Sequence, residues 1–248
     1  MIKDALAEDR VVVYYQPIYS VDHKRFTSAE ALVRILDQEG KLVPPGAFIQ
    51  VAESNGMIIE LGRRVLEKAC LFYQRHDLER CGVEYIEVNL SVAQCSDARL
   101  SEDYIGIMES SGIEPCHINL EITESTSAKE KQTLISHMEH MISCGVNFSL
   151  DDFGSGASNL NYIMDMPVRF VKFDREMIQA YFSSDKAKYV MEAAMHMIHG
   201  LGLGIVAEGV ETEEQYRKME EIKINYIQGY YFSRPLPEQE FLAFLRQS

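Results

Sequence analysis

The sequence is poor in basic residues and lacks both a cysteine framework and a long apolar run. It has 24 Lys and Arg against 38 Asp and Glu, for a formal net charge of −14, which argues against broad binding to a polyanion such as DNA. Its five cysteines are scattered and never spaced C-x-x-C, so they indicate neither a disulfide framework nor a zinc knuckle. No segment approaches the roughly 20 apolar residues of a membrane span, and the N-terminus lacks the apolar region of a signal peptide. We therefore expect a cytoplasmic chain without direct membrane insertion.

The length of 248 residues exceeds that of a usual domain but lies within the range of α/β barrels. The composition, 46% hydrophobic and 25% charged, is ordinary for a soluble globular protein. We find no internal repeat, and no Pro/Ser-rich linker divides the sequence. We expect residues 1–248 to form a single domain.

Short apolar or alternating runs recur along the chain, separated mostly by segments of helical periodicity. Strands are predicted near Val11–Ile18, Ala29–Ile35, Tyr85–Leu90, Ile118–Thr123, Asn147–Asp151, Phe170–Phe173, Gly204–Ala207 and Ile227–Phe232. Helices are predicted near Ala47–Ser54, Leu61–Arg75, Ala128–Cys144, Asn159–Asp165, Arg175–Gly200, Thr212–Glu221 and Pro237–Arg246. Eight strands alternating with helices predict an α/β fold, a TIM-like (β/α)8 barrel.

The first connection departs from this alternation. About ten residues separate the first two predicted strands, too few for the helical crossover that a parallel pair requires. We therefore expect the first strand to run antiparallel to the second.

Polar side chains interrupt or close six consecutive predicted strands. They are Glu30, Asn89, Glu121, Asp151, Asp152, Lys172, Asp174 and Glu208. In such barrels the C-terminal ends of the strands converge on one mouth, where reactive groups are found. Carboxylates held this close repel one another and are costly to bury unpaired. A single lysine cannot neutralise them all, so cations are expected at the mouth.

The donor types indicate hard cations. Oxygen ligands without a His or Cys cluster favour Mg²⁺ or Mn²⁺ over zinc, and the adjacent pair Asp151–Asp152 is suited to bridging two ions. Two such ions favour in-line displacement at phosphorus, so the pattern predicts phosphate-ester hydrolysis. A single strand-end acid is more often a helix cap or a surface ion pair, an explanation that weakens when so many positions coincide.

Eight ordered blocks of sequence carry a family resemblance. They read YYQPI (14–18), AEALVR (29–34), EVNLS (87–91), LEITES (120–125), DDFGSG (151–156), VKFD (171–174), AEGVET (207–212) and QGYYFSRPL (228–236). With Glu30-Ala31-Leu32 among them, the chain resembles the EAL-domain family. That resemblance implies a barrel with one antiparallel strand and metal-dependent hydrolysis of cyclic di-GMP to linear pGpG in bacterial second-messenger signalling.

The resemblance also implies roles for individual residues. The metal ligands, for two Mg²⁺ or Mn²⁺ ions, would be Glu30, Asn89, Glu121, Asp151 and Asp152. Glu208 would engage the second metal or act as a base for water, and Lys172 would orient the water or stabilise charge on the phosphoryl group. Contacts to the cyclic dinucleotide would come from Gln16, Leu32, Arg34, Asp174 and Gln228. Glu124 and Glu211 would support the loop and the site around it.

Two of these residues have a plainer interpretation. Arg34 lies on the same side of an extended strand as Glu30, four residues earlier, where its planar fork could hold a phosphate oxygen. The alternative, which we favour less, is a surface or counter-ion arginine. Lys172, likewise, could be a simple counter-ion of the neighbouring aspartates.

The glycine-rich loop after Asp152 departs from the family pattern. Ser155 stands where threonine is common and Ala157 where tyrosine is common, which puts loop stability and the coupling of a homodimer to metal occupancy in doubt. Phe173 replaces a frequent isoleucine and should affect packing only. Family members often sit behind sensory or cyclase domains, so the chain could belong to a longer protein.

Two other functions remain open. A catalytically weak or inactive receptor would bind cyclic di-GMP and signal by changing shape, although such receptors usually lack several of the acids present here. A two-carboxylate glycosidase would need only an acid and a base or nucleophile, and would leave Asn89, Lys172 and the paired aspartates unexplained.

Overall fold

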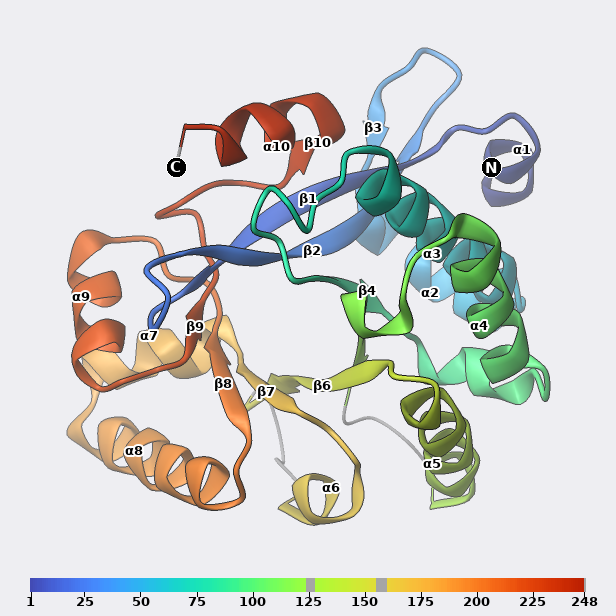
Figure 1. Cartoon of the computed structure of the whole chain (residues 1–248). Coiled ribbons are helices and arrows are strands. Elements are labelled where there is room, and N and C mark those ends of the chain that lie inside the picture. The colour runs from blue at the N-terminus through green and yellow to red at the C-terminus, as the bar shows by residue number, and fades with distance from the viewer. Residues whose placement is uncertain (124–127, 155–159, 248) are drawn as a thin grey trace.

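A computed structural model of the chain describes residues 1–123, 128–154 and 160–247. Its centre is a closed barrel of eight strands surrounded by helices (Figure 1). Around the barrel the strands are β1 (Val11–Ser20), β2 (Arg25–Leu36), β4 (Tyr85–Asn89), β5 (Ile118–Thr123), β6 (Asn147–Phe153), β7 (Phe170–Phe173), β8 (Gly204–Ala207) and β9 (Tyr226–Ile227). The predicted TIM-like barrel is confirmed.

The strand β1 closes this barrel and runs antiparallel to both of its neighbours. It pairs with β2 over its whole length, as in Gln16 with Glu30, and with β9 through Tyr19 and Ile227. All other neighbouring barrel strands pair in parallel. The antiparallel first strand is therefore confirmed, and a turn of four residues joins it to β2 because no helix has to cross over.

The helices pack around the outside of the barrel. They are α1 (Ile2–Ala7), α2 (Ile49–Ser54), α3 (Ile58–Arg75), α4 (Leu100–Ser111), α5 (Ala128–Ser143), α6 (Leu160–Asp165), α7 (Arg175–Ser183), α8 (Asp185–Gly200), α9 (Glu213–Glu221) and α10 (Glu238–Leu245). Tyr15 of β1 stacks on Phe72 of α3, with ring centroids 4.2 Å apart, and also contacts Phe241 of α10. These buried rings fasten the antiparallel strand to two helices.

Short elements complete the chain. The strands β3 (Leu42–Val43) and β10 (Leu236–Pro237) pair antiparallel with β2 and β1. Three 3₁₀ turns lie at Pro45–Ala47, Val92–Ser96 and Pro115–His117. Among the described residues no helix is long and apolar enough to cross a membrane.

Three features differ from the sequence-based predictions. The predicted helix 175–200 is two helices, because Ser184 is extended and its hydroxyl accepts a hydrogen bond from the Ala187 amide as the cap of α8. The predicted last strand 227–232 stops after Ile227. The helices α1 and α4 were not predicted; α4 has a mixed surface with only weak amphipathic character.

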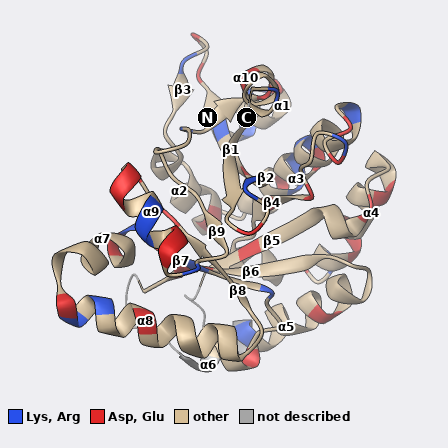
Figure 2. Cartoon of the chain, turned by 60° about the vertical axis from the view of Figure 1, so that its left-hand side comes forward, with Lys and Arg blue, Asp and Glu red and all other residues tan. Residues whose placement is uncertain are grey.

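Charged side chains are distributed unevenly. Figure 2 shows that most Lys, Arg, Asp and Glu lie on helices and turns, while the strands are mainly uncharged. The exceptions are the polar groups that face the inside of the barrel near its mouth, including Glu30, Glu121 and Lys172, all buried. Buried charge in this fold is thus concentrated at one place.

The mouth depends on a close backbone contact at Gly229, next to Gln228. Val210 donates its amide to the Gln228 carbonyl over 3.2 Å, and a Cβ on Gly229 would overlap the Val210 backbone. We predict that Gly229→Ala lowers the free energy of unfolding by about 2 kcal/mol or more through overpacking. Denaturant titration measures this loss.

The matched control is Gly106→Ala in α4, where an added Cβ meets no atom within 4 Å. It should leave stability unchanged or raise it by up to about 1 kcal/mol, as alanine favours a helix. Equal effects of the two substitutions would contradict the close-contact explanation.

Candidate functional site

The ammonium of Lys172 lies at the centre of the barrel mouth among four glutamates. Its Nζ is 2.6 Å from Glu208 Oε1, 3.4 Å from Glu87 Oε2 and 3.9 Å from Glu30 Oε2, and it also pairs with Glu121 Oε1. The lysine side chain is 1% exposed. The buried ammonium makes charge-assisted contacts with four acidic partners. Because one positive charge faces four acids, the site keeps excess negative charge.

The carboxylate of Glu30 is held by two amide side chains. Asn89 donates to Oε1 over 2.9 Å, and Gln228 donates to Oε2 over 2.7 Å. Gln228 also donates to Gln16 Oε1 at 3.2 Å, and the Gln16 amide donates to the Ser233 carbonyl. Residues of β1, β2, β4 and the segment after β9 thereby fix the orientation of one carboxylate.

The paired aspartates stand at an irregularity in β6. Its pairing with β7 shifts register between Leu150 and Phe153, and Asp152 has a φ of 56°. In a regular strand adjacent side chains point to opposite faces, whereas a bulge and a left-handed residue re-aim them. The Asp152 amide donates to Asp151 Oδ1 at 2.8 Å. Asp151 is half-buried and lines the second cavity, while Asp152 is exposed and feels the charges of Asp174, Lys172 and Glu30.

Burial acts to raise the pKa of Glu30 and Glu121, while the ammonium of Lys172 acts to lower it. Burial opposes ionisation of Glu30, but Lys172 and the amides of Gln228 and Asn89 outweigh it and lower the pKa of Glu30. Burial raises the pKa of Glu121 well above its usual value, with Glu87 and Glu30 adding to the effect against the attraction of Lys172. Burial disfavours the charge of Lys172, yet the surrounding glutamates, Glu121 first, raise its pKa.

Two further acids at the mouth titrate near neutrality. Burial raises the pKa of Asp151 to about 6, opposed by Lys172 and helped by Glu30 and Asp152. Burial also raises the pKa of Glu208 to about 8, again against Lys172 and with a contribution from Asp151. Such shifts mark a cluster whose negative charge is only partly compensated by protein groups.

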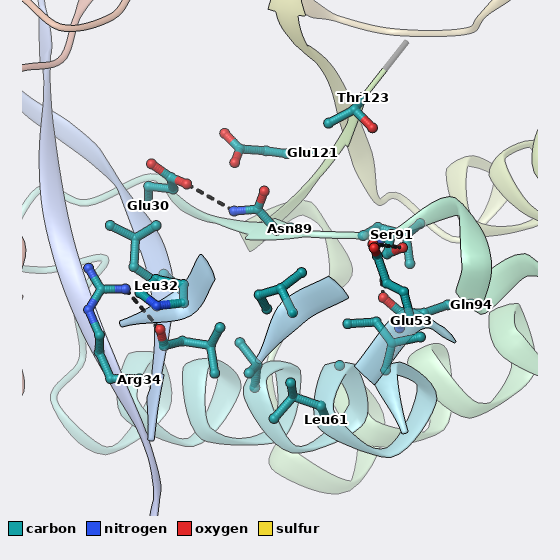
Figure 3. A pocket seen from close by; sticks show the side chains of 18 residues that line it. Glu30, Leu32, Arg34, Glu53, Leu61, Asn89, Ser91, Gln94, Glu121 and Thr123 are labelled. Atoms are coloured by element: carbon teal, nitrogen blue, oxygen red, sulfur yellow. Dashed lines mark hydrogen bonds between the residues drawn. The ribbon is translucent and has the colours of Figure 1, made fainter. Parts of the chain in front are cut away.

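Two cavities open on either side of the outer part of β2. One, of about 310 Å³, lies between β2, β4 and α3 and is shown in Figure 3, with Glu30, Asn89 and Glu121 at one end. The other, of about 280 Å³, is lined by residues from β1, the end of β8 and the segment after β9. Glu30, Leu32 and Arg34 line both cavities. A ligand with two arms could therefore straddle this strand.

Arg34 and Asp174 are two further residues that the sequence predicted for the site. Arg34 is half-buried, donates to the Val33 carbonyl at 2.8 Å and lies over the Tyr14 ring. Among the described residues it forms no close ion pair with a carboxylate, although the charge of Glu30, four residues earlier on the same strand, acts on it. Asp174 is buried and caps α7 by accepting from the Met177 amide at 2.8 Å.

Glu211 and Glu124 were predicted to support the site. Glu211 is exposed, pairs with Arg175 at 2.9 Å and lines the second cavity with it. Glu124 lies outside the described residues, as do Ser155 and Ala157 of the loop after Asp152.

Glu87 is the site residue that the sequence reasoning missed. It is fully buried, accepts from the Asn119 amide at 3.2 Å and approaches Lys172. The signal was present, because Glu87 precedes Asn89 by two residues and alternate residues of a strand share a face. The sequence reasoning took only Asn89, which closes this strand, as the contribution of the strand to the mouth.

The raised pKa values of Asp151 and Glu208 predict a pH dependence. In the metal-free protein these carboxyls keep protons that the unfolded chain releases, so stability falls as the pH rises from about 4 towards 8. A divalent cation must displace the same protons. We expect the Mn²⁺ dissociation constant to fall from about pH 6 to about pH 8 with net proton release.

Calorimetric titration of Mn²⁺ in buffers of different ionisation enthalpy measures this proton release. An Mn²⁺ affinity that does not change with pH would contradict the assignment of these acids to the cation site.

Comparisons with known proteins were made for the whole chain. The family model described as EAL domain matches residues 1–235. The chain is 32% identical to the signaling protein YkoW of Bacillus subtilis, over 99% of this chain and 30% of that protein. It is 34% identical to the cyclic di-GMP phosphodiesterase NbdA of Pseudomonas aeruginosa, over 99% of this chain and 31% of that protein. The chain thus spans about a third of the length of these relatives.

A solved structure agrees with the sequence relatives. The PaMucR phosphodiesterase in complex with c-di-GMP superposes with a TM-score of 0.88 at 32% identity, covering 97% of each chain. The match of the family model over most of the sequence and this structural likeness agree with each other. The chain belongs to the EAL domain family.

Proposed function

We propose that this chain acts as one EAL domain and hydrolyses one phosphodiester bond of cyclic di-GMP, with divalent metal ions, to release linear pGpG. The observation that carries the proposal is the convergence of Glu30, Glu121 and Glu208 on Lys172 at the mouth of the barrel, with Asn89 hydrogen-bonded to Glu30. The names of NbdA and of the PaMucR complex support the substrate.

The donor groups fit Mg²⁺ or Mn²⁺. The acids of the mouth and the Asn89 amide offer oxygen ligands from several strands, the chemistry that these ions prefer. Glu121 Oε2 is buried with no hydrogen-bond partner among the described residues, so it is free to take a cation. Glu30, Asn89, Glu121, Asp151 and Asp152 would hold two ions. When bound, the ions would polarise the phosphoryl group and make a nearby water more acidic.

The protein groups supply the remaining chemistry. Water attacks phosphorus, the bond from phosphorus to the 3′ oxygen breaks, and the leaving oxygen takes up a proton. Glu208, with its pKa near 8 in the metal-free site, is suited to accept the proton of the attacking water. Lys172, fully charged and fixed by its acidic partners, would stabilise the negative charge that develops on the phosphoryl oxygens.

The two cavities beside β2 suit the two halves of a cyclic dinucleotide. Glu30 and Leu32 line both cavities, with Arg34 at their outer rim, so the scissile phosphate would lie near β2. Arg34 would hold a phosphate oxygen, and Gln16 and Gln228 would contact the ligand from the second cavity. Asp174 caps α7 through one carboxylate oxygen, and its other oxygen would contact the ligand.

The setting of the domain is also a proposal. The relatives compared above are about three times longer than this chain, which suggests control by a sensory or cyclase domain in a longer protein. We propose in addition that the domain works as a homodimer in the cytoplasm, with Glu211 and Glu124 supporting the coupling of its loops to the site.

The direct test is to incubate the purified protein with cyclic di-GMP and Mg²⁺ or Mn²⁺ and to quantify pGpG by chromatography. We expect turnover by the wild type and none by Glu30→Ala. Lys172→Met should lower kcat by about 10²-fold to 10³-fold, as observed when a donor to developing charge is removed.

The receptor alternative predicts another result of the same assay. Tight binding of cyclic di-GMP without pGpG in either metal would sink the hydrolase proposal and leave a signalling receptor. The paired aspartates and the glutamates around Lys172 favour the enzyme, because a receptor needs no cluster of unneutralised acids to bind a phosphodiester.

Arg34 provides a test of substrate placement. Arg34→Ala should raise KM about 10-fold, the effect of losing one hydrogen bond to a charged group, with a smaller change in kcat. The control is Arg217→Ala, an exposed residue of α9 paired with Glu213, which should leave both constants unchanged. An unaltered KM in Arg34→Ala would show that the phosphate lies elsewhere.

A further inference from the structure

We propose that Glu87 is a positioning residue that holds Lys172 when divalent ions occupy the mouth. The inference rests on the proposed metal-dependent function and adds to it a residue outside the predicted ligand set. In this role Glu87 neither contacts the ions nor touches the substrate. It would keep an ion pair with the lysine ammonium when the other glutamates coordinate the metals.

Glu87 differs from the other three partners of Lys172 in its depth. It lies two residues before Asn89 on β4, so it faces the same side of the strand but lies further from the open end. Glu87 and Glu121 are both fully buried, but Glu30, Glu121 and Glu208 each line at least one of the two cavities beside β2, whereas Glu87 lines neither. A cation that enters from solvent therefore reaches Glu208, Glu30 and Glu121 before Glu87.

The same carboxylate oxygens are needed both by Lys172 and by the proposed metal ions. In the metal-free protein Lys172 pairs with Glu121 Oε1, Glu208 Oε1 and Glu30 Oε2. These three residues are also the proposed metal ligands and base. Divalent ions at the mouth would take these carboxylates for coordination and repel the ammonium, so Lys172 must exchange at least part of its partners when the ions bind.

A buried ammonium cannot give up its partners without a replacement, because an unpaired buried charge is strongly destabilising. Glu87 Oε2 meets this need. It is 3.4 Å from Lys172 Nζ and has no hydrogen-bond partner among the described residues. Its other oxygen accepts from the Asn119 amide, and Asn119 also donates to Ser149. Glu87 is thus anchored by Asn119 at one oxygen, and the carboxyl also faces Lys172 and Glu121.

The consequence is a coupling between Glu87 and metal affinity that passes through Lys172. Without the charge of Glu87, Lys172 would stay on Glu121 and Glu208 and compete with the incoming ion. Removing any acid near the mouth also weakens cation binding through space, but that effect does not need the lysine. A double-mutant cycle separates the two effects.

The test measures Mn²⁺ binding to metal-free protein by isothermal titration calorimetry. The variants are wild type, Glu87→Gln, Lys172→Met and the double variant. We expect Glu87→Gln to raise the Mn²⁺ dissociation constant about tenfold in the wild-type background and less than about twofold in the Lys172→Met background. The matched control is Ser149→Ala, which removes the other partner of Asn119 and should leave Mn²⁺ affinity unchanged.

Equal weakening in both backgrounds, or no weakening in either, would overturn the proposal while the metal-dependent function stands. A wild type that binds no Mn²⁺ would overturn the function itself and this inference with it. If Glu87→Gln does not fold, Glu87→Asp carries the same cycle, because it keeps the charge but retracts it by one methylene. It should weaken Mn²⁺ binding by a smaller factor, again only when Lys172 is present.

Discussion

A lysine ammonium without access to water needs acidic partners, and in this barrel four glutamates converge on one such group. Lys172 alone cannot balance Glu30, Glu87, Glu121 and Glu208, and burial raises the pKa of Glu121 and Glu208. The metal-free site is therefore electrostatically incomplete. In the proposed function, divalent cations would balance this excess of negative charge and would supply the chemistry of the site.

The fold brings these groups together by simple means. Parallel strands place their C-terminal ends at one rim, and the antiparallel β1 closes the ring while its Gln16 lies opposite Glu30. The irregularity in β6 allows two adjacent aspartates to serve the same mouth. The outer part of β2 divides the surface beside the mouth into two cavities, a shape suited to a ligand with two similar halves.

Much of this could be predicted from the sequence. Strand and helix alternation indicated the barrel, and the short first connection indicated the antiparallel strand. Acids that interrupt or close the strands, such as Glu30 and Glu121, indicated the mouth. These inferences succeed because they depend on local periodicity and on a rule of the fold.

The features that escaped prediction depend on contacts across the structure. Glu87 lies within its strand, and only the position of Lys172 on a distant strand gives it a role. Ser184 breaks a continuous helical pattern because its side chain caps the next helix. The last barrel strand is short since the chain turns at Gly229 against the Val210 backbone. Glu87 carried a local signal in its two-residue spacing from Asn89, and Ser184 in its capping side chain, but neither pattern alone shows the contact that the residue makes.

The central claim is that the mouth acids hold divalent cations. Anomalous diffraction from crystals grown with Mn²⁺ tests it most directly. The account predicts two manganese peaks at the mouth, each within about 2.0–2.4 Å of carboxylate or amide oxygens from Glu30, Asn89, Glu121 and the paired aspartates. Crystals with no manganese at the mouth, or with manganese bound only elsewhere on the protein, would contradict it.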